Sequence, residues 1–329
     1  MIYHLTTPTH WSRFGPGEGY VSETFDQEGF IHLSTESQVP GVLQRYYWGV
    51  PRLLKLHVDE MKLTAELKYE PATGGELFPH LYGPLNREAV ARVEEITQPL
   101  SVGLVLFPGL TQLDLTGPYE VLCRLPQVQV HLLAETPDPV PTGDGPLRLV
   151  PTTTFADCPR LDLLLVPGGP GVDAMLSHPP LLDFLRERGT EARYVTSVCS
   201  GSLLLAAAGL LDGHRATTHW LSLDLLGLFP GVTVLPDRVV KSGNRFTGGG
   251  VTAGIDFALA LVAELYGADL AQLIQLKIEY NPQPPFQSGH PDVAPADVLE
   301  TARRSPSTPR RAEAVRRAVE RLISPKTNG

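Results

Sequence analysis

The feature that most constrains the fold is a buried strand that runs directly into a helix of small residues, with a cysteine at the junction. Residues 194–198 (Tyr-Val-Thr-Ser-Val) are largely β-branched, as a buried strand is. Residues 200–211 are rich in Ala and Leu, and Gly209 is a typical helix-ending residue. Cys199 lies between the two segments. This pattern predicts a nucleophile elbow, a sharp turn that presents one side chain above a sheet, for which the small Gly201 leaves room.

The elbow also predicts the ionisation of the cysteine. At a helix N-terminus, unpaired N–H groups and the helix dipole favour a thiolate, so the pKa of Cys199 is expected to fall from about 8.5 to about 4–7.5. The alternative is a buried structural cysteine, because free cysteine is among the most buried residue types. The position at the junction favours a nucleophile.

Length, cysteine usage and the N-terminus indicate the general class of the protein. The 329 residues are enough for two domains, each with its own core. Cys123, Cys158 and Cys199 are odd in number and widely spaced, which argues against a disulfide framework and against a metal site. Neither a signal peptide nor an apolar run of the roughly 18 residues that a membrane span needs is recognisable. We expect a cytoplasmic protein without a membrane partner.

The charge is distributed unevenly. The net charge is −9, but residues 301–329 carry +6 and the first 300 residues carry −15. An acidic body disfavours general nucleic-acid binding, so no nucleic-acid partner is expected. Residues 309–323 are rich in Arg and Ala and are predicted to form a helix with a solvated basic face, so residues 301–329 are expected to form a basic helical tail.

Residues 1–98 are predicted to form a small α+β domain. The pattern indicates strands, short helices and a loop punctuated by Gly and Pro. The strands are expected at 3–7, 29–35, 53–58 and 89–96, the helices at 9–14 and 37–47, and the loop at 74–85.

This segment resembles a small bacterial domain family of unassigned function, through the runs IYHLTT, EGFIHLST and GGELFPHLYGPL. The first two runs also resemble motifs of tRNA phosphotransferases, which have the ADP-ribosyltransferase fold and bind NAD between split sheets. The resemblance implies that fold, with a pocket near His4, His32 and Glu76 that could take NAD. Leu5 replaces a small glycine and Phe30 replaces a histidine of those enzymes, which argues against their activity. An accessory domain without a ligand is the alternative.

From residue 101 onward, strands and helices alternate. This alternation predicts an α/β fold with a doubly wound parallel sheet, flavodoxin-like, in which ligands bind at the carboxyl ends of the strands. The strands are expected at 102–107, 128–133, 162–167, 194–198 and 232–235, and the helices at 117–125, 172–175, 179–188, 200–211, 252–266 and 269–280.

Two further motifs follow strands of this sheet. Asp114 lies in the turn after the first strand, where it can be a catalytic carboxylate or only a helix N-cap. Gly168 and Gly169 follow the third strand, and their N–H groups, with that of Ser200, could form an oxyanion pocket; a plain tight turn is the alternative.

His219 and Trp220 lie in an Arg-Ala-Thr-Thr-His-Trp run twenty residues beyond Cys199. A histidine can serve as base to a cysteine, but spacing alone does not bring the two together. The glycine-rich run at 246–250 lacks the Lys-Ser/Thr ending of a phosphate loop and is interpreted as a packing element at the start of a helix.

Residues 101–300 resemble the PfpI-like branch of the class I glutamine amidotransferase superfamily, and within it the cyclohexyl-isocyanide hydratases. The resemblance lies in the runs QLDLTGPYEVL, TTFADCP, ARYVTSVC, RATTHW, TAGIDFAL and EYNPQPPF. It implies a homodimer, a nucleophile at Cys199 and an acid/base carboxylate at Asp114. Ser200 stands where those hydratases have Thr and the related proteases have His, which argues against proteolysis.

The resemblance implies hydration of a small isocyanide to an N-substituted formamide, without a metal or cofactor in this domain. Thiolate attack on the terminal carbon leaves charge on nitrogen, so a nearby acid is needed, and Asp114 can supply it only if it shares a proton with Cys199. His219 is then expected to shape the pocket. The alternatives are a redox-sensing module with an oxidisable cysteine or another small-molecule hydrolase or lyase. Regulators of this superfamily append helix-turn-helix domains, for which the residues after Pro282 leave too little room.

Overall fold

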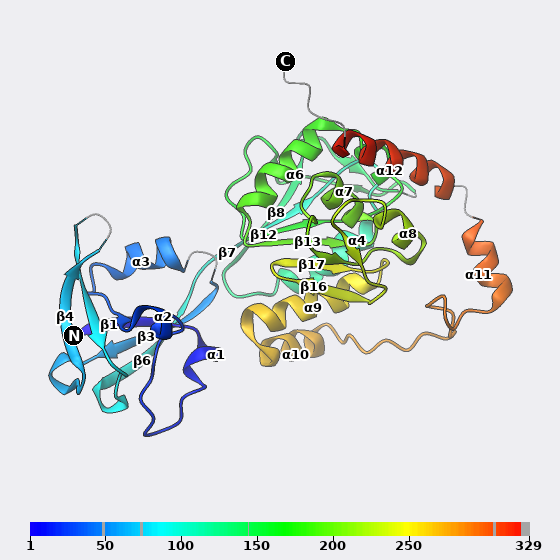
Figure 1. Cartoon of the computed structure of the whole chain (residues 1–329). Coiled ribbons are helices and arrows are strands. Elements are labelled where there is room, and N and C mark those ends of the chain that lie inside the picture. The colour runs from blue at the N-terminus through cyan, green and yellow to red at the C-terminus, as the bar shows by residue number, and fades with distance from the viewer. Residues whose placement is uncertain (48–49, 73–74, 144, 305–306, 324–329) are drawn as a thin grey trace, which may run out of the picture. The chain divides into compact units, whose positions relative to one another are not determined.

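The computed structural model describes residues 1–329 apart from 48–49, 73–74, 144, 305–306 and 324–329. The chain divides into two compact units, unit 1 (Met1–Pro99) and unit 2 (Leu100–Gly329) (Figure 1). No helix among the described residues is both long and apolar enough to cross a membrane.

Unit 1 is built from two antiparallel three-stranded sheets. In the first the order is β1-β3-β6, and in the second it is β2-β5-β4. The inward positions of both sheets, together with Tyr20, form the core of the unit, in which Leu56 and Leu81 are fully buried. The elements are β1 (Ile2–Thr6), α1 (Pro8–Trp11), α2 (Phe25–Glu28), β2 (Ile31–His32), α3 (Val39–Tyr46), β3 (Arg52–Val58), η1 (Glu60–Lys62), β4 (Glu66–Pro71), β5 (Leu77–Tyr82), η2 (Arg87–Ala89) and β6 (Val90–Thr97).

The loop predicted at 74–85 is wrong from Leu77 to Tyr82, which form the central strand of the second sheet; Gly74 lies outside the described residues. Pro79 is tolerated there because it pairs with Tyr69 of β4 but directs its carbonyl to the opposite side, where it accepts the Leu33 N–H at 2.9 Å. Because β2 ends at His32, the missing N–H of Pro79 lies at the end of the paired segment, beside the Leu33–Pro79 bond, and no bond inside the β2–β5 ladder is lost.

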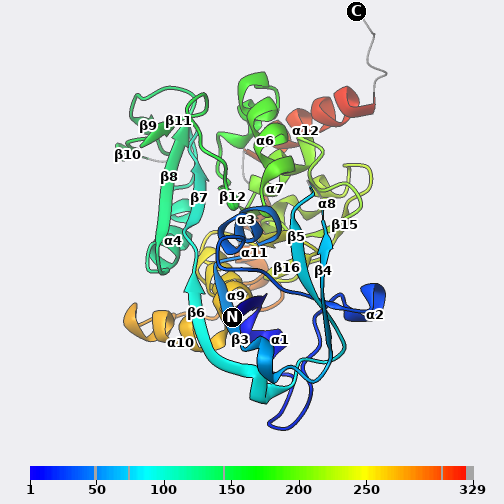
Figure 2. The same ribbon diagram turned by 90° about the vertical axis from the view of Figure 1, so that its left-hand side faces the viewer.

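Unit 2 contains a seven-stranded sheet in the order β11-β8-β7-β12-β13-β17-β16, in which only β16 is antiparallel to its neighbour. The predicted α/β fold with a doubly wound, mostly parallel sheet is confirmed. Figure 2 shows β11, β8 and β7 side by side at one edge. The strands are β7 (Leu100–Val105), β8 (Val128–Ala134), β11 (Thr153–Thr154), β12 (Leu163–Val166), β13 (Tyr194–Val198), β16 (Val239–Ser242) and β17 (Arg245–Gly248); the short β9 (Val140–Pro141) and β10 (Arg148–Leu149) pair separately.

The fifth strand of the sheet is not the one predicted at 232–235. That segment contains β15 (Thr233–Val234), which pairs with β14 (Arg215–Ala216) in a separate two-stranded sheet. The strand beside β13 is β17, which comes from the glycine-rich run at 246–250 that the sequence pattern favours as the start of a helix. Its Phe246 and Thr247 are buried, and its glycines allow close packing, since a Cβ on Gly248 would meet Phe257 at 3.2 Å.

Helices cover both faces of this sheet (Figure 1). The buried positions of α9 recur every three to four residues, as in any helix with one face on a core. One face carries α4 (Gln112–Leu122), α9 (Ala253–Tyr266) and α10 (Ala268–Lys277); the other carries α5 (Val172–Met175), α6 (Pro179–Glu191), α7 (Gly201–Ala207) and α12 (Ser307–Ile323), and η3 (Trp220–Ser222), α8 (Leu223–Leu226) and α11 (Ala296–Arg303) complete the unit.

The C-terminal helix α12 is not the solvated tail that its charge indicates. It packs against α5 and α7, and its Val315 and Ala318 are buried in the core of unit 2. Arg316 and Arg317 remain exposed on the opposite face. The basic face is therefore solvated as expected, but it belongs to a helix that completes the fold.

Candidate active site

The candidate site lies at the carboxyl edge of the seven-stranded sheet. Asp114 is in the first turn of α4 after β7, Gly168 follows β12, and Cys199 follows β13. The order of the strands reverses direction between β7 and β12, because β8 and β11 lie on one side of β7 and the strands from β12 onward lie on the other. Doubly wound folds bind their ligands at such a switch point.

Cys199 is held in a strained turn between β13 and α7. Its φ of 56° is in the left-handed region, which residues with a side chain rarely adopt. Its N–H donates to the carbonyls of Gly248 and Gly249 at 3.0 and 2.9 Å, which stabilises the turn. Gly201 is needed because a Cβ there would lie 2.2 Å from the Val166 carbonyl oxygen. The local geometry is that of a nucleophile elbow.

The Asp114 carboxyl is fully buried. Its Oδ2 accepts the Gly168 N–H at 3.0 Å, and its Oδ1 has no hydrogen-bond partner among the described residues. Burial raises the pKa of Asp114 from 3.8 to about 7, although hydrogen bonds from Cys199 and Gly168 and the charge of Arg311 act in the opposite direction. Asp114 is therefore poised to exchange a proton near neutral pH.

Cys199 is buried, with 6% of the residue exposed, and the ionisation of its thiol differs from the expectation. Burial and the Asp114 carboxylate raise its pKa to about 12, although the N–H groups of Ser200 and Val251 act to lower it. The predicted fall to about 4–7.5 is wrong, because desolvation and a neighbouring negative charge outweigh the helix N-terminus. Because burial and the neighbouring carboxylate oppose ionisation of the thiol, the Cys199–Asp114 pair keeps one proton after Asp114 has ionised.

The glycine N–H groups position the pair instead of facing a substrate. The Gly168 N–H is used by Asp114, and the Gly169 N–H donates to Ser200 Oγ at 3.1 Å. The expected oxyanion donors Gly168 and Gly169 are therefore already occupied within the protein. The N–H groups that act on the Cys199 sulfur are those of Ser200 and Val251, and the sequence analysis missed Val251.

His219 lies near the same edge but is poorly placed to act as a base. Its Nδ1 accepts the Leu221 N–H at 3.2 Å, so the proton of the neutral ring resides on Nε2. The ring packs against Gly250, where a Cβ would meet its Cδ2 at 2.6 Å. Trp220 follows in η3, 5.9 Å from the His219 ring, and lines a small hollow with residues between 288 and 302.

Arg311 of α12 is a second residue that the sequence analysis missed. Its Nε contacts Asp173 Oδ1 at 2.7 Å and its Nη2 donates to the Gly169 carbonyl at 2.8 Å. Burial lowers the pKa of His219 and the charge of Arg311 adds to this effect, whereas for Asp114 the charge of Arg311 acts against the burial that raises the pKa. Nothing in the local sequence signals this role, because about 140 residues separate Arg311 from Asp173 and Gly169.

In unit 1, two of the three predicted pocket residues line one cavity. These are His4 and His32, whereas Glu76 is exposed and does not line it. The carboxylates that do line the cavity are those of Glu23 and Glu28. Glu76 directly precedes β5, whose first residue is Leu77, and its exposed side chain lies outside the lining of this cavity.

Comparison with known proteins assigns both units to families. A model described as the DJ-1/PfpI family matches residues 100–264, half of the chain. The chain belongs to the DJ-1/PfpI family. A model described as a protein of unknown function (DUF952) matches residues 5–93. The two matches confirm the resemblance of residues 101–300 to the PfpI-like proteins and that of residues 1–98 to a domain family of unassigned function. The resemblance to the ADP-ribosyltransferase fold stays a prediction.

Individual relatives agree with this assignment. The chain is 56% identical to isonitrile hydratase of Pseudomonas putida over 225 residues, which is 68% of this chain and 98% of that protein. It is 31% identical to the HTH-type transcriptional regulator GbdR of Pseudomonas aeruginosa, but covers only 49% of it. A solved structure of a ThiJ/PfpI family protein from Pseudomonas syringae covers 66% of this chain and 91% of that one, with 42% identity and a TM-score of 0.64.

Proposed function

We propose that unit 2 hydrates an isocyanide to an N-substituted formamide through a covalent adduct on Cys199, with Asp114 as the acid and base. The observation that carries the proposal is the burial of Cys199 beside Asp114, where burial raises the pKa of both groups and the pair keeps one proton once Asp114 has ionised. The similarity to isonitrile hydratase over almost that whole enzyme supports the substrate class. Isocyanides are small, uncharged and largely apolar, so a buried site suits them.

The first step uses the proton that the pair holds. The Cys199 sulfur attacks the terminal carbon of R–NC and forms the S–C bond. The electron pair is left on that carbon, and not on nitrogen as the sequence analysis expects, so the shared proton passes to the same carbon. The product is the thioimidate S–CH=N–R, and Asp114 is left as a carboxylate. The Ser200 and Val251 N–H groups stabilise the negative charge on sulfur before the attack.

The second step adds water to the thioimidate. Asp114 takes a proton from water as the hydroxide bonds to carbon, and passes that proton to nitrogen. The resulting S–CH(OH)–NH–R collapses when the C–S bond breaks and the hydroxyl proton returns to the pair. The formamide leaves, and the pair again holds one proton. Protons and electrons balance without an oxidant, a metal or a cofactor.

The competing proposal, a peroxide-sensing cysteine, has less support. A sensor thiol is accessible and largely ionised at neutral pH. Cys199 is 6% exposed and its pKa is raised to about 12 by burial and by Asp114. These properties favour a thiol that reacts only with a small molecule that enters the site and receives a proton.

The test is formamide production from cyclohexyl and aryl isocyanides. The full chain should turn both over, and Asp114→Asn should reduce kcat by at least about 10³-fold, since it removes the acid and base. His219→Ala should keep most of the activity. Absence of turnover in the unmodified chain, together with rapid oxidation of Cys199 by peroxide, would favour the sensor. A loss in His219→Ala as large as in Asp114→Asn would mean that His219 is the base.

A further inference from the structure

Unit 1 contains a cavity of about 560 Å³, a volume typical of small-molecule sites. Its described lining residues all lie between His4 and His80 of this unit. By type they are four aromatic side chains, three histidines, five hydroxyl residues, four aliphatic residues and two glutamates. The cavity therefore offers stacking surfaces and hydrogen bonds together with a negative charge.

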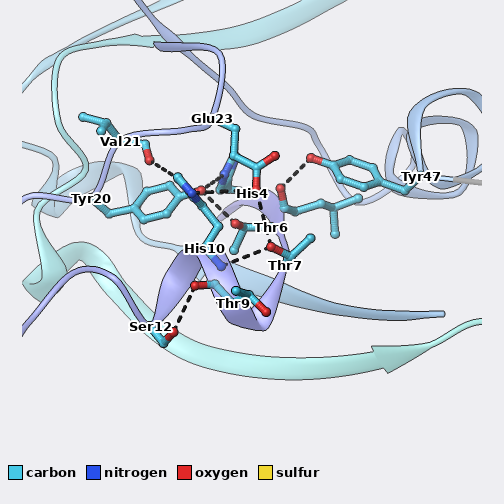
Figure 3. A network of polar contacts seen from close by, with 11 residues as sticks. His4, Thr6, Thr7, Thr9, His10, Ser12, Tyr20, Val21, Glu23 and Tyr47 are labelled. Atoms are coloured by element: carbon cyan, nitrogen blue, oxygen red, sulfur yellow. Dashed lines mark hydrogen bonds and ion pairs between the residues drawn. The ribbon is translucent and has the colours of Figure 1, made fainter. Parts of the chain in front are cut away.

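One wall of the cavity is held by a buried hydrogen-bond network, which Figure 3 shows. His4 Nδ1 donates to the His32 carbonyl at 2.8 Å, so its Nε2 is the acceptor for the Tyr20 hydroxyl at 2.8 Å. Burial lowers the pKa of His4 to about 4, so the ring is neutral. Tyr47 is fixed separately by donating to the Leu5 carbonyl at 2.7 Å. The wall is preorganised before any ligand binds.

Two polar groups of the lining lack partners. His80 has a side chain that is 8% exposed; its Nδ1 bonds to Glu70 at 2.9 Å, whereas its Nε2 is buried and makes no hydrogen bond among the described residues. The Oγ of Ser22, which also lines the cavity, is likewise buried and makes no hydrogen bond among the described residues. Since leaving a buried polar group unpaired is unfavourable, these atoms are natural partners for a polar group of a ligand.

The charges of the lining do not fit NAD, the cofactor that the sequence resemblance suggested. Glu23 and Glu28 are the ionisable carboxylates of the lining, and no Lys or Arg is present among its described residues. The undescribed residues of unit 1 are a Trp, a Thr and two Gly, none of them cationic. The pyrophosphate of NAD would enter a negative site without the Arg or Lys that phosphate recognition normally uses.

We propose that this cavity binds a small ring-bearing molecule that is neutral or cationic and carries no phosphate. The rings of Tyr46, Tyr47 and Phe78 provide faces for stacking or for a cation–π contact. Glu28, which pairs with His32 at 3.2 Å, and Glu23, whose side chain is 63% exposed, attract a positive charge to the rim. The site is independent of the chemistry proposed for unit 2.

Titration calorimetry on the full chain tests this proposal with a matched series. Nicotinamide riboside has a cationic ring and no phosphate, and its mononucleotide and NAD add one and two phosphates. The riboside should bind saturably, and the mononucleotide and NAD should each bind at least about fivefold more weakly at low salt. Adenosine serves as the neutral ring-bearing probe and should also bind.

Variants of the lining residues test whether the heat of riboside binding comes from this cavity. The double variant Glu23→Gln/Glu28→Gln should weaken riboside binding by about three- to tenfold, because it removes two partly exposed charges. Glu76→Gln, at an exposed glutamate outside the lining, should leave binding unchanged. Thermal unfolding of both variants checks that unit 1 remains folded.

Three results would overturn the proposal. The first is tighter binding of NAD than of the riboside, which would mean that the phosphates are recognised. The second is the absence of saturable heat with both the riboside and adenosine at millimolar concentration. The third is an equal loss of affinity in Glu76→Gln and in the double variant.

Discussion

Replacing Gly168 by Ala should inactivate the site of unit 2 while leaving the fold largely intact. A Cβ at this position would lie 2.5 Å from the Ser200 nitrogen, 2.7 Å from Ser200 Oγ and 3.0 Å from Asp114 Oδ2. The backbone nitrogen of Ser200 and the buried Asp114 cannot both keep their places. Gly168 also donates its N–H to the Asp114 carboxylate, so a shift of the Gly168 backbone moves that carboxylate relative to Cys199.

The expected magnitudes follow from these contacts. Overpacking of this kind destabilises a protein by about 1–3 kcal/mol. A displacement of reacting groups by about 1 Å can reduce activity by about 10²-fold. Formamide production by Gly168→Ala should therefore fall by about 10²-fold in kcat/KM, while Tm falls by about 2–4 °C for each kcal/mol.

Gly289→Ala is the matched control, because no described atom lies within 4 Å of the added Cβ and the φ of Gly289 is not in the left-handed region. Its activity and Tm should match those of the unmodified chain. Activity of Gly168→Ala within twofold of the unmodified chain would refute the reasoning. It would mean that the Asp114 position is not critical or that the turn relaxes freely.

Two further predictions concern the pH profile and the assembly. Below about pH 7 both members of the Cys199–Asp114 pair are protonated, so kcat/KM should rise with pH through an apparent pKa near 7 and stay high above it. Arg311→Gln removes a charge that acts to lower the pKa of Asp114, so the rise of kcat/KM should move to higher pH. Arg317→Gln, on the exposed face of the same helix, should leave the pH profile unchanged. Equal pH profiles for the two variants would contradict an effect of Arg311 on Asp114. The family resemblance predicts a homodimer, so light scattering should give about twice the chain mass of 35.8 kDa, and a monomer mass would contradict it.

The sequence predicted the elements that local patterns determine. The β-branched run before Cys199 and the small residues after it indicate the elbow, and Asp114 is recognisable as a carboxylate after the first strand of unit 2. The β5 strand was missed because Pro79 and the flanking glycines are typical of loops. Only its pairing shows that the missing N–H of Pro79 falls beyond the end of β2.

Other features depend on contacts that no local pattern contains. Arg311 reaches Gly169 across about 140 residues, through a helix whose composition indicates a solvated surface. The pKa of Cys199 was predicted in the wrong direction because helix position is visible in the sequence, whereas burial beside Asp114 is a tertiary property. The unit 1 cavity shows the same limit, since its carboxylates are those of Glu23 and Glu28 and not that of Glu76.

The most direct test of the account is the rate of formamide production by Cys199→Ala at saturating isocyanide. Covalent catalysis requires the sulfur, so the rate should fall by at least about 10⁴-fold, to the level of a reaction without the nucleophile. The small Ala side chain leaves the elbow and Asp114 in place, and unchanged Tm would show that the fold is intact. Turnover within tenfold of the unmodified chain would contradict the account, because Asp114 alone would then be activating water.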